Sequence, residues 1–196
     1  TYMQERTFRV VLPWNAETHS VESLLKLLSK ESAEKDCAVA ALRKLAASSK
    51  KRVAIAEAGG INLLVQVLRD GSMASREHAA AALRKLAASA KNRGAIAEAG
   101  GIAPLVLLLQ QGSTGAQEWA AAALRKLAAS AKNRVIIAEA GGINPLVALL
   151  QNGSVAAKEW AAGALENLSL STANQVAIAE AGGIKPLVRL LRDAAA

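Results

Sequence analysis

Hydrophobic and polar positions repeat along this chain with a period of 41 residues. Each period contains three stretches with apolar residues at helical spacing, and glycine interrupts the pattern twice. In the period 132–172 the pattern predicts a short helix over about 133–140, a second helix that starts near Pro145, and a longer third helix over about 155–170. A unit of three short helices cannot bury its apolar face alone, so neighbouring units are expected to stack around one continuous core.

Pairs of glycines mark the end of the first helix in each unit. They occur at Gly59-Gly60, Gly100-Gly101, Gly141-Gly142 and Gly182-Gly183. Glycine suits this place because it adopts, without a steric penalty, the left-handed conformation found at many helix C-termini. The period and its two glycine breaks predict an all-α fold, a right-handed α-solenoid of 41-residue three-helix repeats, without a strand in residues 20–193.

The pattern divides the chain into a short segment and one repeat domain. Residues 1–19 fit no repeat, although residues 7–14 among them are apolar and β-prone. The repeat domain, 20–193, is expected to comprise a partial repeat 20–49, full repeats 50–90, 91–131 and 132–172, and a partial repeat 173–193.

The final helix of the pattern, over 185–193, is followed by no third helix in this sequence. We therefore expect its apolar side chains to be exposed and to mediate self-association, because exposed apolar patches usually mark interaction sites. These side chains are Leu187, Val188, Leu190 and Leu191. The alternative, that the covering helix belongs to a longer parent protein, stays open.

Three short segments recur in register across the repeats. Ala-Ile-Ala-Glu-Ala-Gly-Gly-Ile occupies 54–61, 95–102 and 177–184, Pro-Leu-Val occupies 104–106, 145–147 and 186–188, and Ala-Ala-Gly-Ala-Leu-Glu-Asn-Leu occupies 161–168. These segments resemble the armadillo-repeat family, whose members include β-catenin and importin-α. The resemblance implies that the third helices line a concave groove for extended peptide segments of partner proteins. The close likeness among the repeats fits either recent duplication or consensus design.

Two rows of side chains result when the third helices are placed side by side, because positions i, i+4 and i+7 share one stripe of a helix. One row consists of Cys37, His78, Trp119 and Trp160, the other of Lys44, Lys85, Lys126 and Asn167, and Arg43, Arg84 and Arg125 stand next to the second row. We interpret both rows except Cys37, together with Arg84 and Arg125, as peptide-binding residues. Two alternatives stay open: the tryptophans pack between helices, and the charges form a solvated helix face.

The two family members imply different ligands. Asn167 matches the groove asparagine with which importin-type proteins bind the backbone of an extended peptide, but Gly163 stands where a tryptophan is expected. Lysine replaces this asparagine in the other repeats, which is more similar to the basic groove of β-catenin and its acidic partner segments. The chain carries a formal net charge of +8, and such a surplus favours anionic partners. We expect a protein–protein interaction scaffold that binds extended, acidic peptides.

Two other functions remain open on the sequence. The chain fits an engineered or duplicated repeat scaffold without an evolved ligand, and it also fits a nucleic-acid-binding solenoid that uses its basic surface. Readers of single-stranded nucleic acid stack the bases on aromatic platforms. Two tryptophans and one histidine are a thin supply for that purpose, so nucleic acid is the less favoured partner.

Sequence patterns for catalysis, metal binding and cofactor binding are absent, so we expect no enzymatic activity, metal or cofactor. Cys37 and His78 stand in adjacent repeats, but stacked helices lie about 8–10 Å apart, whereas proton transfer requires about 2.6–3.2 Å. No apolar run has the length of a membrane span, so a membrane is not an expected partner. The single cysteine fits a reducing compartment, and we expect a cytoplasmic or nuclear location.

Overall fold

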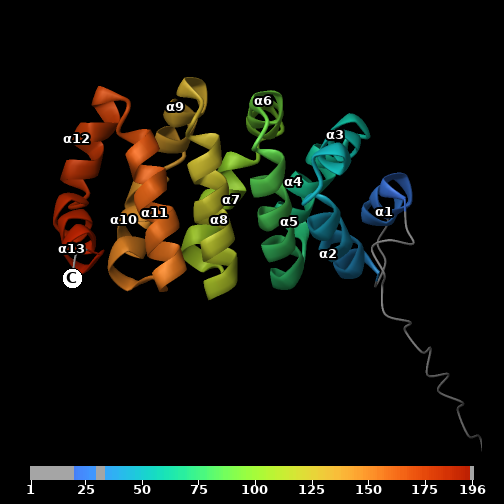
Figure 1. Ribbon diagram of the computed structural model, residues 1–196, viewed down its shortest axis with the longest axis horizontal. Coiled ribbons are helices and arrows are strands. Elements are labelled where there is room, and N and C mark those ends of the chain that lie inside the picture. The colour runs from blue at the N-terminus through green and yellow to red at the C-terminus, as the bar shows by residue number, and fades with distance from the viewer. Residues whose placement is uncertain (1–19, 30–33, 195–196) are drawn as a thin grey trace, which may run out of the picture.

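The computed structural model describes residues 20–29 and 34–194, and these residues form thirteen α-helices and no strand (Figure 1). The helices follow one another in a recurring order of first, second and third helix. The first helices are α3 (Ser49–Glu57), α6 (Ala90–Glu98), α9 (Ala131–Glu139) and α12 (Thr172–Glu180). The second helices are α1 (Val21–Leu28), α4 (Gly60–Asp70), α7 (Ile102–Gln111), α10 (Ile143–Asn152) and α13 (Ile184–Ala194). The third helices are α2 (Lys35–Leu45), α5 (Met73–Leu86), α8 (Thr114–Leu127) and α11 (Val155–Leu168).

Helices of the same kind lie side by side along one axis. Figure 1 shows the third helices as one layer and the first helices along one edge, with α1 at one end of the row and α13 at the other. Extensive contacts join helices of the same repeat or of adjacent repeats. This arrangement confirms the predicted all-α solenoid of three-helix repeats.

Each full third helix begins at a serine N-cap. The hydroxyl oxygens of Ser72, Ser113 and Ser154 each accept a hydrogen bond, 3.1 Å long, from the backbone N–H three residues further on. A serine cap satisfies one of the N–H groups that a helix N-terminus leaves without a partner. The second break of the sequence pattern therefore fixes where the third helices start.

The two glycines of each pair are required for different steric reasons. Gly141 has a φ of +73°, in the left-handed region, and an added Cβ would meet no atom within 4 Å. A Cβ on Gly142 would instead lie 2.8 Å from Cγ2 and 2.9 Å from the carbonyl oxygen of Ile137. The first glycine thus permits the turn, and the second lets the next helix approach the preceding one closely.

Alanine and leucine of the third helices form the centre of the core. In α8, Ala120, Ala123, Leu124 and Leu127 are fully buried, and α11 repeats this pattern 41 residues later. Alanine lets the backbones of consecutive third helices approach closely, while leucine supplies most of the apolar area removed from water. The same side chains therefore determine both the spacing of the third helices and the stability of the stack.

Within the described ranges, no single helix is long and apolar enough to cross a membrane. Two consecutive pairs of helices, α6 with α7 and α9 with α10, reach the length and apolar composition of a membrane span only when taken together. The two helices of each pair are bent relative to each other, by 80° and 81°. The apolar stretch 7–14 that the sequence singled out lies outside the described residues.

Candidate peptide-binding surface

The third helices carry the candidate site. We call it the third-helix surface and define it by the row Cys37, His78, Trp119 and Trp160, the row Lys44, Lys85, Lys126 and Asn167, and the arginines Arg43, Arg84 and Arg125. Trp119 and Trp160 are half-buried, and both pack against the hydrophobic core. One part of each indole therefore stabilises the stack, and another part remains accessible to a ligand.

Arginines of one repeat lie over the tryptophan of the next. The Arg84 Cζ atom lies 5.1 Å from the centre of the Trp119 ring and 5.7 Å from that of Trp160. Arg125 continues the series, with its Cζ atom 5.5 Å from the centre of the Trp160 ring. These distances are typical of cation–π contacts. The two tryptophans and two arginines form one alternating cluster, which we call the Arg–Trp stack.

Gly163 makes room for the last member of this stack. A Cβ added at Gly163 would lie 2.5 Å from Nε and 2.8 Å from Cδ of Arg125. The corresponding residues of the two preceding repeats are the alanines Ala122 and Ala81. The absence of a side chain at Gly163 therefore allows the Arg125 side chain to pass close to the backbone of α11, next to Trp160.

The Arg84 guanidinium is partly removed from water. Burial lowers the pKa of Arg84 below its ordinary value. Its Nε atom is buried and has no hydrogen-bond partner among the described residues. Buried donors are normally satisfied, so this N–H is an unsatisfied polar group inside the Arg–Trp stack.

His78 stands at the tryptophan position of the preceding repeat. Burial lowers the pKa of His78, the positive charge of Arg43 lowers it further, and Glu77 and Asp36 oppose these effects. The Nδ1 atom of His78 is also buried without a hydrogen-bond partner in the described part of the chain. The neutral imidazole therefore extends the aromatic row at neutral pH.

The lysine row does not present a uniform set of free charges. The Lys85 ammonium donates a hydrogen bond to the carbonyl oxygen of Arg43, at 2.9 Å, and the Asn167 amide donates to that of Arg125, also at 2.9 Å. Lys44 and Lys126 are exposed. Lys85 and Asn167 thus join consecutive third helices, and this leaves Lys44 and Lys126 as the accessible members of the row.

Positive charge dominates the electrostatics around Lys85. Burial lowers the pKa of Lys85, and the charges of Arg43, Arg84 and Arg52 each lower it further. Each of these positive charges disfavours the charged form of its neighbours, and an anion bound among them would reduce that repulsion.

Among the described residues, no group of three or more His, Cys, Asp or Glu side chains is arranged to hold a metal ion. Cys37 is a half-buried free thiol.

The sequence pattern did not predict two sets of side-chain hydrogen bonds between repeats. Serine caps donate to a carboxylate of the preceding repeat, from Ser113 to Glu77 at 3.0 Å and from Ser154 to Glu118 at 2.5 Å. Ser72 makes the same contact with Asp36. Each carboxylate precedes its serine by 36 residues, and this recurring spacing is the signal that could have revealed them.

Buried asparagines form the second set. The side-chain amides of Asn92, Asn133 and Asn174 donate to the carbonyl oxygen of the last residue of the preceding third helix, at 3.0, 3.2 and 3.1 Å. Asn133 donates additionally to the carbonyl oxygen of Arg93, at 3.2 Å. The asparagines recur every 41 residues, so their structural role was detectable in principle.

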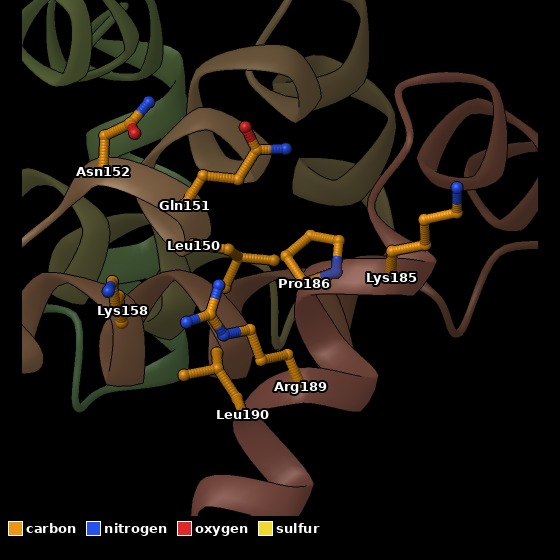
Figure 2. A pocket seen from close by; sticks show the side chains of 8 residues that line it. All are labelled: Leu150, Gln151, Asn152, Lys158, Lys185, Pro186, Arg189 and Leu190. Carbon is orange, nitrogen blue, oxygen red and sulfur yellow. The ribbon is translucent and has the colours of Figure 1, made fainter.

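A separate hollow of 470 Å³ lies between α10, α11 and α13, where side chains from the three helices converge (Figure 2). Its lining includes Gln151, Asn152, Lys158, Lys185, Pro186 and Arg189. Two repeats earlier, a hollow of 70 Å³ has Arg76 and Pro104 at the places of Lys158 and Pro186. The hollow is therefore a recurring product of helix stacking, and we assign no function to it.

The stacked repeats and the surface on their third helices define the chain as an α-solenoid repeat protein. Residues 15–192 match the family model of the plant U-box protein ARM repeat region. The chain belongs to the armadillo-repeat family, as its recurring segments indicated. No curated protein sequence matches the chain.

Solved structures with the same architecture include several designed proteins. An engineered protein is 34% identical with a TM-score of 0.81, over 88% of this chain and 72% of the other. Computationally designed armadillo repeat proteins for modular peptide recognition are 32% identical with a TM-score of 0.81, over 87% and 74%. A designed armadillo repeat protein in complex with the peptide (KR)4 is 28% identical with a TM-score of 0.80, over 87% and 73%.

Proposed function

We propose that this chain is a peptide-binding scaffold and that its third-helix surface binds extended, acidic segments of partner proteins. The carrying observation is the half-buried Arg84 guanidinium, which lies between Trp119 and Trp160. A carboxylate of a ligand would pair with this guanidinium from its solvent side. Charge-assisted hydrogen bonds of this kind are stronger than neutral ones.

The residues of the surface would contribute in different ways. Trp119 and Trp160 offer rigid apolar area, and large aromatic residues and arginine are the side chains that most often dominate binding energy. Lys44 and Lys126 are exposed, so they would act mainly on the association rate and on its salt dependence. Lys85 and Asn167 already bond to the backbone of the preceding repeat, and they would position the stack while donating any remaining N–H group to a ligand.

The designed relative in complex with (KR)4 supports peptide binding by this architecture. Its ligand is basic, whereas the third-helix surface of this chain is lined with arginine and lysine. Repulsion between like charges would therefore disfavour the same peptide here. We infer that the two proteins share a mode of presentation but differ in the sign of the ligand charge.

A fluorescence anisotropy titration tests the proposal with three labelled probes: a Glu/Asp-rich peptide, the peptide (KR)4 and a single-stranded oligonucleotide. Each probe is titrated at low and at high salt. The acidic peptide is expected to bind best and (KR)4 least. Preferential binding of the oligonucleotide would support the nucleic-acid alternative, and a scaffold without an evolved ligand would bind none of them.

Variants then locate the binding surface. Trp119→His introduces the residue that the preceding repeat carries at this position, so the fold should tolerate it. Its expected cost is about 2 kcal/mol, or roughly thirtyfold in affinity, for loss of a central aromatic contact. Lys126→Gln should weaken binding at low salt, whereas Lys132→Gln, which removes an exposed charge from the first helix α9, should not. Equal effects of the two lysine changes would refute the assignment of the surface.

Self-association through α13 stays a prediction. Val188 and Leu191 are 42% and 72% exposed, whereas Leu187 and Leu190 are half-buried against the core. Only part of the expected apolar patch is therefore free to bind another molecule. Sedimentation velocity over a concentration series tests this prediction, and a strictly monomeric protein at the highest concentration would refute it.

A further inference from the structure

A groove of 420 Å³ lies between α3 and α6, on the edge of the molecule that the first helices form (Figure 1). We call it the edge groove and define it by Val53, Ala56, Glu57, Ile61, Lys91 and Ala95. None of these residues belongs to the third-helix surface. Binding sites for small ligands have volumes of about 300–1,000 Å³, so the edge groove is large enough for a few side chains of a ligand.

The floor of the edge groove is apolar and open. Ala56 and Ala95 are half-buried and Ile61 is buried, whereas Val53 is 54% exposed. Ile136 of α9 stands at the position of Ala95 and is half-buried against the core. The small side chain of Ala95 therefore leaves space between α3 and α6 that a larger side chain would occupy.

A hydrogen bond between neighbouring first helices is also missing at this place. Asn133 of α9 donates to the carbonyl oxygen of Arg93 in α6, at 3.2 Å. The equivalent Asn92 lines the edge groove, and among the described residues it donates to the Leu86 carbonyl alone. Asn92 therefore leaves α3 and α6 unconnected here, and its second amide N–H has no acceptor in the described part of the chain.

Charges of opposite sign stand at the two ends of the edge groove. Lys91 is exposed in the first turn of α6, and the Arg52 side chain donates to the carbonyl oxygens of Ala46 and Ala47, just before α3. Glu57 is exposed at the last position of α3. Because α3 has nine residues and an α-helix rises by about 1.5 Å per residue, about 12 Å separate the positive end from the negative end.

These charges distinguish the edge groove from a related groove beside α12. That groove, of 390 Å³, repeats the apolar positions at Ala138, Ile143 and Ala177. Its described lining includes no lysine or arginine, and α12 has Ala173 at the position of Lys91. The stacking of repeats therefore produces the apolar floor, and the sequence of α6 adds the positive charge.

The two charged ends and the apolar floor specify the chemistry of a ligand. Side chains i, i+2 and i+4 of an extended peptide lie on one face and span about 13 Å, which matches the distance between the charged ends. An acidic side chain would pair with Lys91, an aliphatic one would cover Val53 and Ala95, and a basic one would pair with Glu57. A peptide segment meets all three requirements, whereas a small carboxylate would meet only the first.

We propose that the edge groove binds an extended segment of a partner protein with an acidic, a large aliphatic and a basic residue at alternate positions. Residues 1–19 contain no such run in either direction. The two runs of this kind in the sequence, 22–26 and 189–193, lie in α1 and α13, so a folded second copy does not present them in extended form. The segment is electrically neutral, unlike the acidic segments proposed for the third-helix surface.

Two acetylated and amidated peptides, Asp-Ser-Leu-Ser-Lys and Lys-Ser-Leu-Ser-Asp, present the pattern in the two chain directions. Each is titrated into isotope-labelled protein and followed by two-dimensional NMR. At least one peptide is expected to shift the backbone amide signals of Val53 and Lys91, and to leave the indole signals of Trp119 and Trp160 in place. Half-saturation is expected at about 1 mM, because one aliphatic side chain and two exposed ion pairs supply little binding energy.

The apolar contact is tested by filling the groove. Ala95→Ile introduces the residue that α9 carries at this position, so the fold should tolerate it. It should raise the half-saturating concentration at least about tenfold, because the added side chain takes the place of the ligand's leucine. A peptide with serine instead of leucine should lose binding to a similar extent, and this comparison requires no change in the protein.

Charge changes test the two ends of the groove. Lys91→Ala should weaken binding by about twofold to fivefold, as expected for one exposed ion pair. Lys132→Ala, the same change one repeat further on, should leave binding unaltered. Glu57→Lys should reverse the preference at the other end, so that a peptide with glutamate instead of lysine binds better than the original.

The outcomes separate this proposal from the acidic-peptide proposal. Arg84→Gln should leave the titration unchanged, since Arg84 belongs to the third-helix surface alone. The edge groove is overturned as a binding site if neither peptide saturates at ten times the expected concentration, if only third-helix signals shift, or if Ala95→Ile binds as well as the unaltered protein. Shifts of the same amide signals on raising the protein concentration alone would show that a second copy is the occupant instead.

Discussion

Asn133→Ala is expected to destabilise the fold although the residue lies far from any candidate ligand. Asn133 is 1% exposed, and its side-chain amide donates to the carbonyl oxygens of Leu127 and Arg93, both at 3.2 Å. The Leu127 carbonyl also accepts from the N–H of Ser130 at 3.1 Å, so the change leaves it with one partner. The cost is therefore that of two lost hydrogen bonds, about 1–3 kcal/mol in the free energy of unfolding.

The other buried asparagines provide an internal scale for this value. Asn92 and Asn174 donate one hydrogen bond each, to Leu86 and Leu168. Their replacement by alanine should cost about half as much, roughly 0.5–1.5 kcal/mol. Lys132→Ala is the matched control, because Lys132 is the exposed neighbour of Asn133 in α9.

Urea unfolding followed by circular dichroism at a helical wavelength measures all four variants. The comparison is valid if the slope of free energy against urea is the same for each, because repeat arrays can lose two-state behaviour. The reasoning is refuted if Asn133→Ala costs no more than Lys132→Ala, or if Asn92→Ala costs more than Asn133→Ala.

Three further predictions concern single residues. Gly141→Ala should cost about 1–2 kcal/mol of stability, because an L-residue is strained at its φ of +73°. Gly94→Ala is the matched opposite case: it lies inside α6, an added Cβ would meet no close neighbour, and the change should gain about 0.5–1 kcal/mol in the same urea assay. Burial lowers the pKa of His78 in the folded protein. The contribution of His78 to stability is therefore present above the ordinary histidine pKa and is lost as pH falls through that value toward the pKa of the folded state. In unfolding measured from about pH 7 to 5, His78→Gln should flatten this loss. Gly163→Ala should move Arg125 away from Trp160, and lower affinity for the acidic probe at unchanged helicity would confirm it.

The sequence predicted the architecture because the same helix start and stop signals recur in every repeat. The glycine pairs recur every 41 residues, and each pair sits at a backbone position where a side chain is either strained or too large. Serine caps such as Ser154 recur with the same period and start the third helices. Repetition removes the ambiguity that a single glycine or serine would leave, so helix type and order followed directly.

The contacts between repeats were beyond the sequence analysis. Lys85 and Asn167 were predicted to face a ligand, yet each bonds to a carbonyl of the preceding third helix. Whether a long side chain turns toward solvent or toward its neighbour depends on the offset between two helices, which the period alone does not specify. The Arg–Trp stack follows from the same offset, because Arg84 and Trp119 are 35 residues apart and meet only in the folded chain.

The partial exposure of α13 has a related explanation. The sequence predicted four exposed apolar side chains in this helix, but Leu187 and Leu190 pack against the core formed with the preceding repeat. A second helix contacts its own repeat and the preceding one, so only the side directed toward a further helix remains open. Val188 and Leu191 are the two side chains of this set that remain exposed.

The restriction of extensive contacts to adjacent repeats has a consequence for how the molecule opens. A repeat in the middle is held from both sides, whereas a terminal one is held from one side and can open without disturbing the rest. Amide hydrogens of α8 should therefore exchange with solvent most slowly, and those of α12 and α13 should exchange through local fraying at a rate that is insensitive to global stability. Under a pulling force the chain would lengthen in steps of one repeat, so its ends can adapt to a bound partner while the centre keeps the Arg–Trp stack in place.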